Sequence, residues 1–261
     1  MRLSKHLARL SCLAVASTAL AGALAGPGNA ASPGTVEVSN GKIVYTAGKG
    51  GRNSASITVF NGKIAVFDTE PLTPKAGCVK LTPRAVTCGT SALKFVADLG
   101  DGNDSFSVGV DFKGIVKGGP GDDTFIASTK QNTPRRLTFS GGEGTDTVSY
   151  KSSNRPVRVS LDNQPNDGRA IDSDNIRDDV ENIVGSTFGG DTLTGSAAAN
   201  RLDDGGGSGE RLNGLGGDDL LLAKDLAKDS FLACGEGDAD VIVLDKGIDP
   251  EPLGCEEVRE F

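Results

Sequence analysis

A nine-residue frame of the form G-G-x-G-x-D-x-U-x, in which U is apolar, recurs along the chain and constrains its fold more than any other feature. The stretch GGPGDDTFI at 118–126 fits the frame at every defined position, and GGEGTDTVS at 141–149 fits it again. LGDGNDSFS at 99–107 departs only at its first residue. Glycine adopts backbone angles that other residues avoid, and x-U-x makes a very short strand with one residue pointing inward. The frame therefore predicts a coil in which turns and short strands alternate.

Weaker copies of the frame follow in near-tandem order further along the chain. They occupy residues 186–194, 195–203, 205–213 and 214–222. Their apolar frame residues are Leu193, Leu202, Leu212 and Leu221. Phe231 and Val241 are expected to continue this series at spacings of ten. Two nonads make one coil, and stacked coils form two parallel sheets around a thin core. Such a stack is a solenoid, in which each repeat is stabilised by its neighbours. We therefore expect an all-β parallel β-roll.

The thin core of such a roll indicates a role for the aspartates. One large apolar side chain in every nine residues contributes roughly 1.5–3 kcal/mol on burial, whereas ordering nine residues costs on the order of 10 kcal/mol in backbone entropy. Stacked acidic loops also repel one another, and a cation between them converts that repulsion into attraction. Calcium takes carboxylate and backbone carbonyl oxygens as ligands. The candidate calcium ligands are Gly100, Gly102, Asp104, Gly119, Gly121, Asp123, Gly142, Gly144, Asp146, Asp191, Asn200, Glu210 and Asp219.

The spacing of the acids predicts which loops share an ion. Asp104 and Asp123 are nineteen residues apart, close to one coil, and Asp146 follows after twenty-three. The favoured sites therefore lie between residues 100–104 and 118–123, and then between 118–123 and 141–146. In the later copies, Asp191 is expected to face Glu210, and Asn200 to face Asp219. The alternative for every one of these loops is a solvated turn.

Several frame positions depart from the pattern, so fewer calcium ions than motifs are expected. Asn200 and Glu210 stand where aspartate is expected. Ala239 stands at the aspartate position of residues 234–242, which predicts a coil that caps the roll without binding metal.

These nonads resemble the haemolysin-type calcium-binding repeats of RTX proteins, whose repeat binds Ca²⁺ in a parallel β-roll. VENIVGSTFGGDTLTGSAAANRL at 180–202 also resembles the segment that leads into the repeats in that family. The chain is most similar to small secreted calcium-binding repeat proteins of actinobacteria, which have Sec-type signal peptides and a cysteine-containing end like CGEGDADVIV and GCEEV here. The resemblance covers roughly residues 98–258. It implies a β-roll and bound calcium, and it does not specify a biological role.

The first thirty residues read as a secretory signal peptide. Arg2, Lys5 and Arg9 precede an apolar run from about residue 10 to 25, and Gly28-Asn29-Ala30 is a small-x-small cleavage pattern. An uncleaved membrane anchor is the alternative, but the run is short for a bilayer span and contains glycines. We therefore expect a secreted, extracellular protein with no membrane span.

Composition excludes several classes of function. Removing residues 1–30 takes away three basic residues and no acids, which changes the formal net charge from −8 to −11. That charge disfavours nucleic acid and anionic membranes, which bind basic patches, and favours cations. The cut also removes His6, the only histidine. The remaining chain is then unable to build a Ser-His-Asp triad or a histidine-ligated zinc site.

Four cysteines remain after the signal peptide, and an exported chain is expected to oxidise them. Three pairings are possible. The local pairing is favoured, because CVKLTPRAVTC reads as a hairpin whose ends, Cys78 and Cys88, would meet. Cys234 and Cys255 would then clamp the C-terminal tail. A site in which all four cysteines bind a metal is the alternative, although the chain has no C-x-x-C spacing.

The expected organisation is a signal peptide (1–30), an N-terminal cap (31–97), a calcium-binding roll (98–222) and a C-terminal cap (223–261). Within the roll, a first block (98–150) and a second block (185–222) flank an insertion (151–184), whose polar loop reads as solvated. The N-terminal cap is expected to be made of antiparallel β-hairpins, because TVEVSNGKIVYT and ITVFNGKIAVFD both place Asn-Gly between alternating apolar residues. Residues 223–230 lack glycine and are expected to form a short helical excursion.

The functional prediction is a secreted, non-enzymatic protein that binds calcium and folds because it does so. Its expected partners are calcium ions and cell-surface or matrix components, in an adhesive, structural or scaffolding role. The alternative is a β-solenoid polysaccharide hydrolase or lyase, which works without histidine; its candidate residues are Arg135, Arg136, Lys151, Asp172 and Asp174. A third class, an ice-binding solenoid, needs a regular threonine ladder, and only Thr124, Thr147 and Thr192 share the relevant frame position.

Overall fold

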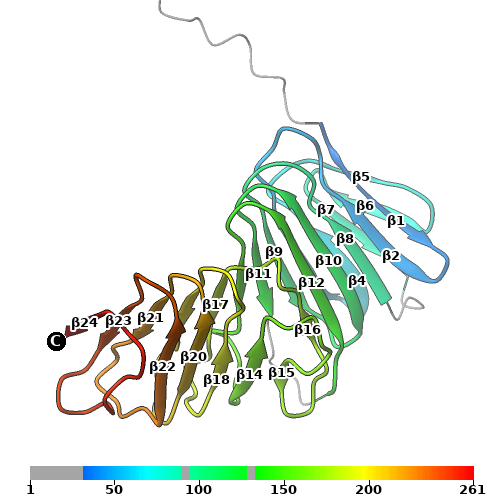
Figure 1. Ribbon diagram of the computed structural model, residues 1–261. Helices are drawn as coiled ribbons and strands as arrows, with labels where there is room; N and C mark the ends of the chain where they lie inside the picture. The colour runs from blue at the N-terminus through cyan, green and yellow to red at the C-terminus, as the bar shows by residue number, and fades with distance from the viewer. Residues whose placement is uncertain (1–31, 90–93, 128–132) are drawn as a thin grey trace, which may run out of the picture.

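A computed structural model describes residues 32–89, 94–127 and 133–261 (Figure 1). The described chain is all-β, with twenty-four strands in three sheets and no helix, and therefore no helix capable of crossing a membrane. The predicted signal peptide lies outside the described residues. Most strand pairs are parallel, an arrangement compatible with the expected solenoid.

The first half of the chain passes back and forth between two sheets. The seven-stranded sheet contains β8 (Lys94–Asp98), β10 (Lys113–Pro120), β12 (Leu137–Glu143) and β16 (Asn175–Ile176). The twelve-stranded sheet contains β9 (Ser105–Gly109), β11 (Thr124–Ala127) and β13 (Thr147–Ser149). Successive strands alternate between the two sheets, and each pairs in parallel with the equivalent strand one coil away. Ser105 thus pairs with Thr124, and Thr124 with Thr147.

The second half keeps one of these sheets and replaces the other. The twelve-stranded sheet continues through β17 (Asn182–Val184), β19 (Arg201–Asp203), β21 (Leu220–Ala223), β23 (Val241–Leu244) and β24 (Glu257–Glu260). A separate five-stranded sheet contains β14 (Val157–Ser160), β15 (Gly168–Arg169), β18 (Thr192–Thr194), β20 (Arg211–Gly216) and β22 (Phe231–Glu236). Figure 1 shows these later strands as a second stack beside the first.

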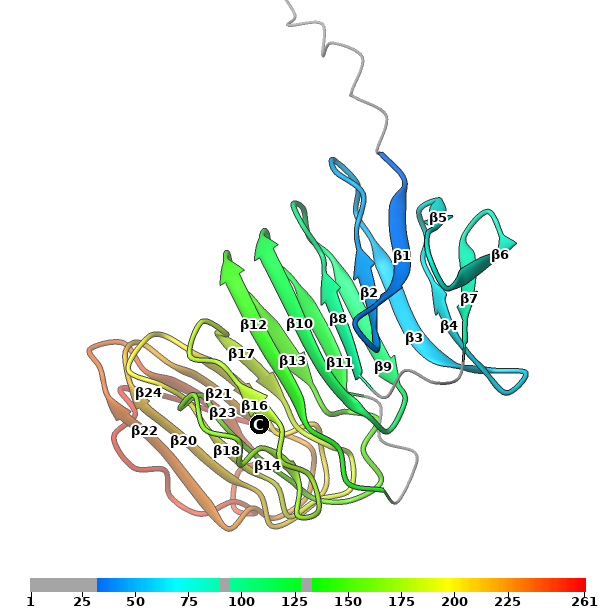
Figure 2. The ribbon, with the colours of Figure 1, turned by 90° about the vertical axis from the view of Figure 1, so that its right-hand side faces the viewer.

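Two antiparallel hairpins begin the described chain, as the Asn-Gly pairs predict. They are β1–β2 (Gly34–Ser39 and Lys42–Thr46) and β3–β4 (Ser54–Phe60 and Lys63–Phe67). Both residues of each Asn-Gly turn have positive φ, with Asn40 at 49° and Gly41 at 71°, which is the requirement of a tight hairpin turn. β2 pairs in parallel with β8, and β3 with β9. The hairpins therefore extend both sheets and cover the edges of their first nonad strands (Figure 2).

Three short strands follow β4, namely β5 (Leu72–Pro74), β6 (Cys78–Thr82) and β7 (Ala85–Cys88). β5 pairs in parallel with β1, whereas β7 pairs antiparallel with both β4 and β6. Cys78 and Cys88 lie opposite each other in the β6–β7 pair and form a disulfide. A second disulfide joins Cys234 to Cys255 and holds the tail that leads into β24. Both predicted local pairings are confirmed.

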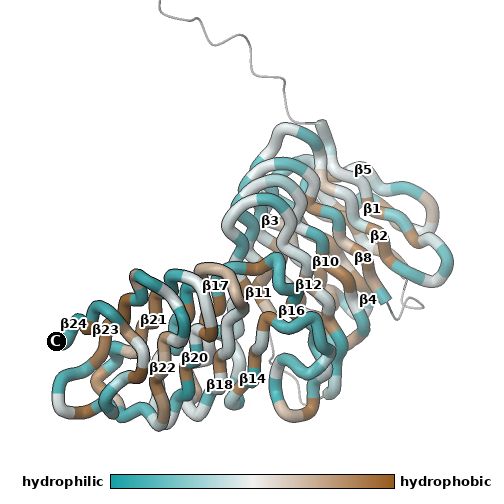
Figure 3. Tube along the Cα trace, viewed as in Figure 1, coloured by the Kyte–Doolittle hydropathy of each residue, from teal (hydrophilic) through white to brown (hydrophobic). Residues whose placement is uncertain are grey.

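The core is a file of inward-pointing frame residues, and strand hydropathy alternates accordingly (Figure 3). In the twelve-stranded sheet, the fully buried file includes Phe106, Phe125, Val148, Ile183, Leu202, Leu221 and Ile242. Across the coil, the ring of Phe125 stacks on that of Phe139 with centroids 5.0 Å apart. The prediction that Phe231 and Val241 continue the file is wrong. Leu232 and Ile242 are the buried residues, because Leu232 follows Leu221 after eleven residues rather than the expected ten, and a shift of one residue moves the opposite face inward.

Two local expectations are also wrong. Residues 223–230 form bends between β21 and β22 and contain no helix. The polar loop of the insertion is not a solvated turn, because Asp167 and Asp174 are completely buried and Asp172 is 9% exposed. Arg135 and Arg169 accompany these acids into the interior and form ion pairs with them, which offsets the cost of burying the charges.

Candidate metal site

Every acidic or amide side chain predicted to bind calcium is buried. Asp104, Asp123, Asp146, Asp191, Asn200, Glu210 and Asp219 are each at most 5% exposed. Each lies just before a strand, at the point where the chain crosses from one sheet to the other. Burial of so many carboxyl groups in turns is costly unless each finds hydrogen bonds or a counter-charge.

Hydrogen bonds arrange five of these residues in one line along the twelve-stranded sheet. The backbone N–H of Asp104 donates to Oδ1 of Asp123 over 2.8 Å, and the N–H of Asp123 donates to Oδ1 of Asp146 over 2.8 Å. The same pattern joins Asn200 to Asp219 over 2.7 Å. We call the line the carboxylate row; it comprises Asp104, Asp123, Asp146, Glu181, Asn200, Asp219, Asp240 and Glu256. Its members link successive coils.

The second oxygen of most row aspartates has no partner. Oδ2 is buried without a hydrogen bond in Asp104, Asp123, Asp146, Asp219 and Asp240. A buried carboxylate oxygen in this state demands either a proton or a cation.

Backbone carbonyls of the next coil lie beside these oxygens. A side-chain carbon at Gly118 would overlap both Oδ2 of Asp123 and the carbonyl oxygen of Gly141. At Gly141, it would overlap Oδ2 of Asp146 and the carbonyl oxygen of Asp179. The first glycine of the frame therefore leaves open a place where a carboxylate oxygen and a carbonyl oxygen of the next coil converge. Gly214 repeats the arrangement with Asp219 and the Cys234 carbonyl.

The other predicted glycine ligands stack in register from coil to coil. A side-chain carbon at Gly119 would overlap the carbonyl oxygen of Gly100, and one at Gly121 would overlap that of Gly102. In the next coil, Gly142 lies in the same way against the Gly119 carbonyl, and Gly144 against the Gly121 carbonyl. The chain has positive φ at all six, for example 114° at Gly119. Only glycine combines that conformation with so close a backbone approach.

Burial shifts the acidity of the row. Removal from water, together with the nearby Asp123 and Glu181 charges, raises the pKa of Asp146 from 3.8 to about 7. Burial likewise raises the pKa of Asp219 to about 7 and that of Asp104 to about 6. The pKa of Asp123 is also raised, mainly by burial. The backbone N–H donors lower each of these pKa values, but burial has the larger effect, so every shift is upward.

Two of the predicted ligands differ because hydrogen bonds satisfy every oxygen of their side chains. Oδ1 of Asp191 accepts from the Val157 N–H, and Oδ2 accepts from the Ser186 N–H. Asn200 accepts from the Ser196 N–H over 2.6 Å and donates to the Glu181 carbonyl over 3.2 Å. These two side chains offer no unpartnered oxygen, in contrast to Asp219.

Asp191 and Glu210 lie outside the row, in loops that lead into the five-stranded sheet. Oε1 of Glu210 accepts from the Gly190 N–H, and the Glu210 N–H donates to Asp229. Glu210 faces the loop of Asp191, as expected. Oε2 of Glu210 and Oδ2 of Asp229 are buried without a hydrogen bond. Burial, together with Glu210, raises the pKa of Asp229.

Sequence reasoning missed several members of these sites. Asp240, not Ala239, takes the aspartate position of the last coil, because its Oδ1 accepts from the Asp219 N–H over 2.7 Å. The assignment of Ala239 to that position is therefore wrong, whereas the expectation that this coil binds no metal stays a prediction. A count of twenty-one residues from Asp219, and of nineteen from Glu210 to Asp229, would have located both. Glu181 gave no such signal, because the insertion separates it from Asp146 by thirty-five residues.

The residues considered for the alternative functions are dispersed. Arg135, Asp172 and Asp174 are buried in the ion-pair cluster, whereas Arg136 and Lys151 are exposed. Thr124 and Thr147 lie side by side in the twelve-stranded sheet, but Thr192 belongs to the five-stranded sheet. The three threonines therefore do not form one ladder.

The donor set fits an oxygen-seeking cation. Across the described ranges, no three acidic, cysteine or histidine side chains gather closely enough to hold a metal by themselves. A cation here would depend on roughly one carboxylate per coil together with backbone carbonyls, a combination that Ca²⁺ accepts. No known family model matches the chain, and no curated protein matches it in sequence, so the proposals below rest on this geometry and on the repeat.

Proposed function

We propose that the chain is a secreted, non-enzymatic calcium-binding protein whose GGxGxD loops bind Ca²⁺ between the stacked coils of a β-roll. The observation that carries the proposal is the set of buried, unpartnered carboxylate oxygens of Asp104, Asp123 and Asp146. They are the acids of the three nonads that fit the frame best.

The ligands proposed for the first two sites are the Asp104, Asp123 and Asp146 carboxylates, with carbonyls from residues 99–102, 118–121 and 141–144. A third site is proposed at Asp219 and Asp240, where the carboxylate oxygens are also unpartnered. Calcium supplies the positive charge that the row lacks. The chain's own contribution is to hold each carboxylate through the backbone N–H of the preceding coil.

Export supports the choice of metal. A chain with a signal peptide and two disulfides meets millimolar calcium outside the cell, where even weak extracellular-type sites are occupied. Binding then contributes directly to the free energy of folding. An adhesive or scaffolding role follows from a rigid, calcium-ordered rod.

The test is thermal unfolding, followed by circular dichroism, of the chelated chain titrated with Ca²⁺ and, separately, with Mg²⁺. Ca²⁺ is expected to raise the melting temperature and Mg²⁺ to have little effect. Asp123→Asn is the informative variant, because an amide keeps the oxygen that accepts from Asp104 and replaces only the unpartnered one. The row already contains one amide, Asn200, although its oxygen accepts from the Ser196 N–H of its own loop.

If the first block binds calcium, Asp123→Asn removes most of the rise in melting temperature that Ca²⁺ produces. The melting temperature in chelator stays the same as that of the wild type. Asp98→Asn is the control, because it makes the same chemical change at an exposed acid at the end of β8. A melting temperature that Ca²⁺ leaves unchanged would overturn the proposal and identify the row as a purely structural ladder of protonated carboxyl groups.

A further inference from the structure

Four basic side chains form a line across the outer face of the seven-stranded sheet. Lys94 and Lys113 are direct partners in the β8–β10 pair. Arg136 immediately precedes Leu137, the partner of Gly114, and Lys42 immediately precedes Ile43, the partner of Phe95. The strands β2, β8, β10 and β12 are adjacent (Figure 2), so neighbouring members lie about 4.8 Å apart in backbone. We call Lys42, Lys94, Lys113 and Arg136 the basic ladder.

The members of the basic ladder are exposed, and the acid that lines the same groove, Asp111, forms no ion pair with them. None of them takes part in an ion pair in the described part of the chain. The segments outside the description, residues 1–31, 90–93 and 128–132, contain no aspartate or glutamate, so they have no acid to offer. Like charges on directly opposite strand positions destabilise a sheet. The ladder therefore costs folding energy that a bound anion would offset.

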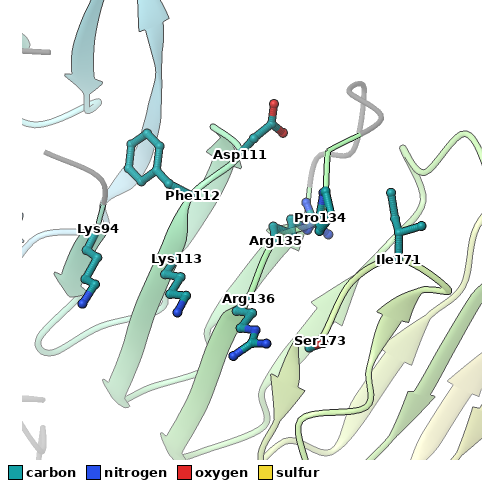
Figure 4. Close-up of a pocket in the computed structure, with 9 residues that line it drawn as sticks. All are labelled: Lys94, Asp111, Phe112, Lys113, Pro134, Arg135, Arg136, Ile171 and Ser173. Atoms are coloured by element: carbon teal, nitrogen blue, oxygen red, sulfur yellow. The ribbon is translucent and has the colours of Figure 1, made fainter. Parts of the chain in front are cut away.

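The surface beside the ladder is a shallow groove with an apolar floor. A pocket of about 300 Å³ is lined by all four ladder residues together with Val96, Ile115 and Thr138. A second pocket of about 450 Å³ continues past Phe112 toward Ile171. Figure 4 shows Lys94, Lys113 and Arg136 projecting in one row, with Asp111 in the turn that precedes β10.

The shape and charge of this surface select a linear polyanion. Its charges must repeat at about the strand spacing, and its uncharged parts must lie on an apolar floor. A chain of uronic acid sugars meets both conditions, because each sugar carries one carboxylate and also presents C–H groups. A single-stranded nucleic acid fits less well, since such sites stack bases on aromatic rings. Of the two phenylalanines that line this groove, Phe95 is buried, and Phe112 packs edge-on against it with ring centroids 6.1 Å apart.

We propose that the basic ladder is a binding site for an acidic polysaccharide, a linear polyuronate lying across strands β2, β8, β10 and β12. The site is separate from the carboxylate row. Its positive charge stands out on a chain whose overall charge is negative. Binding would attach the rod lengthwise to an extracellular uronic acid matrix.

The test is isothermal titration calorimetry with a short oligogalacturonate that is too short to gel with calcium. The wild-type chain is compared with Lys94→Gln/Lys113→Gln, and with Lys63→Gln/Lys80→Gln as a control that removes two exposed charges from strands β4 and β6. We expect the ladder variant to weaken binding at least tenfold and to reduce the salt dependence, because fewer charged contacts are screened. The control variant is expected to bind within twofold of wild type.

Equal weakening of oligogalacturonate binding by both variants would overturn the proposal, since it would show that any basic side chain on the surface attracts the oligosaccharide. Binding that disappears on chelation but is insensitive to the ladder variant would also overturn it, by assigning the sugar to the calcium sites. An oligonucleotide of equal charge is titrated in parallel. Tighter binding of the oligonucleotide than of the oligogalacturonate would contradict the choice of a polyuronate.

Discussion

The backbone N–H of Asp104 donates to the carboxylate of Asp123, which belongs to the following coil, over 2.8 Å. One oxygen of Asp123 is therefore committed to holding two coils together, while the other is buried with no hydrogen bond. The two oxygens of this side chain therefore have separate roles, one in the hydrogen bond between coils and one in the proposed calcium site. A substitution that changes only one oxygen can separate an effect on folding from an effect on calcium binding.

The first glycine of the frame is expected to be intolerant of a side chain. Gly118→Ala places a methyl group against Oδ2 of Asp123 and the Gly141 carbonyl. We expect a loss of about 1–3 kcal/mol in unfolding free energy, as for other overpacked sites, and a weaker response to Ca²⁺. Urea unfolding in calcium and in chelator measures both effects.

Gly89→Ala is the matched control for this substitution. An added carbon at Gly89 meets no atom within 4 Å, and its φ is not positive. Its stability should remain within about 0.5 kcal/mol of wild type, as for most surface substitutions. Similar losses in both variants would show that the crowding at Gly118 is unimportant.

Stability in the absence of calcium is expected to fall as the pH rises. An unfolded aspartate loses its proton near 3.8, whereas folding raises the pKa of Asp146 and Asp219 to about 7 and that of Asp104 to about 6. Between those values the folded chain binds more protons than the unfolded chain, so the stability present at low pH is lost as the pH rises through about 4 to 7.

Melting temperatures in chelator at about pH 5 and about pH 7.5 check this dependence. Asp146→Asn removes one of the titrating groups and should flatten the profile. A fall of unchanged size in that variant would assign the pH dependence to other groups.

The second block offers a pair of aspartates with opposite expectations. Asp191→Asn replaces an oxygen that accepts from a backbone N–H, whichever way the amide turns, because both oxygens accept one. We expect a loss of about 1–3 kcal/mol from the unsatisfied donor. Asp219→Asn leaves the single bond to Asn200 intact and should be tolerated in chelator. Denaturant titration of the two variants tests the difference, and equal losses would contradict it.

Neighbouring arginines at the start of β12 should differ sharply. Arg135→Met leaves Asp172 and Asp174 buried without one of their cations and is expected to cost about 3–5 kcal/mol. Arg136→Met, at an exposed position, should change the unfolding free energy by no more than about 0.5 kcal/mol. Chemical denaturation of both variants provides the comparison, and a mild effect of Arg135→Met would mean that the cluster relaxes to readmit water.

The nine-residue frame was sufficient to predict most of the buried core residues and the positions of the acids. A fixed period with one apolar and one acidic position places Phe125 inside and Asp123 at the crossing, whatever the details of the turn. The two Asn-Gly hairpins and the two disulfides were equally accessible, because each depends on a local stretch or on one available partner.

The errors arose where coils differ in length. The last coil spans twenty-one residues from Asp219 to Asp240, one more than expected, which places Ile242 rather than Val241 in the core and Asp240 rather than Ala239 in the carboxylate row. Register over so short a strand depends on that count alone.

Long-range partners were also beyond the sequence pattern. Asp172 and Asp174 appear solvated until Arg135, thirty-seven and thirty-nine residues earlier, is placed beside them. The basic ladder likewise combines residues at unequal spacings, which become neighbours only through strand pairing.

The hydrogen bonds from backbone N–H groups to the carboxylates of the row all run in one direction along the chain. In each link between these side chains and a backbone N–H, the donor is the earlier residue and the acceptor the later one, from Asn53 and Asp104 to Asp240 and Glu256. In a chain that emerges N-terminus first, the backbone N–H of the most recently formed coil therefore has no acceptor until the acid of the following coil has also emerged. Completion of the rod has to wait for its C-terminal end, which the disulfide beside Glu256 then fastens.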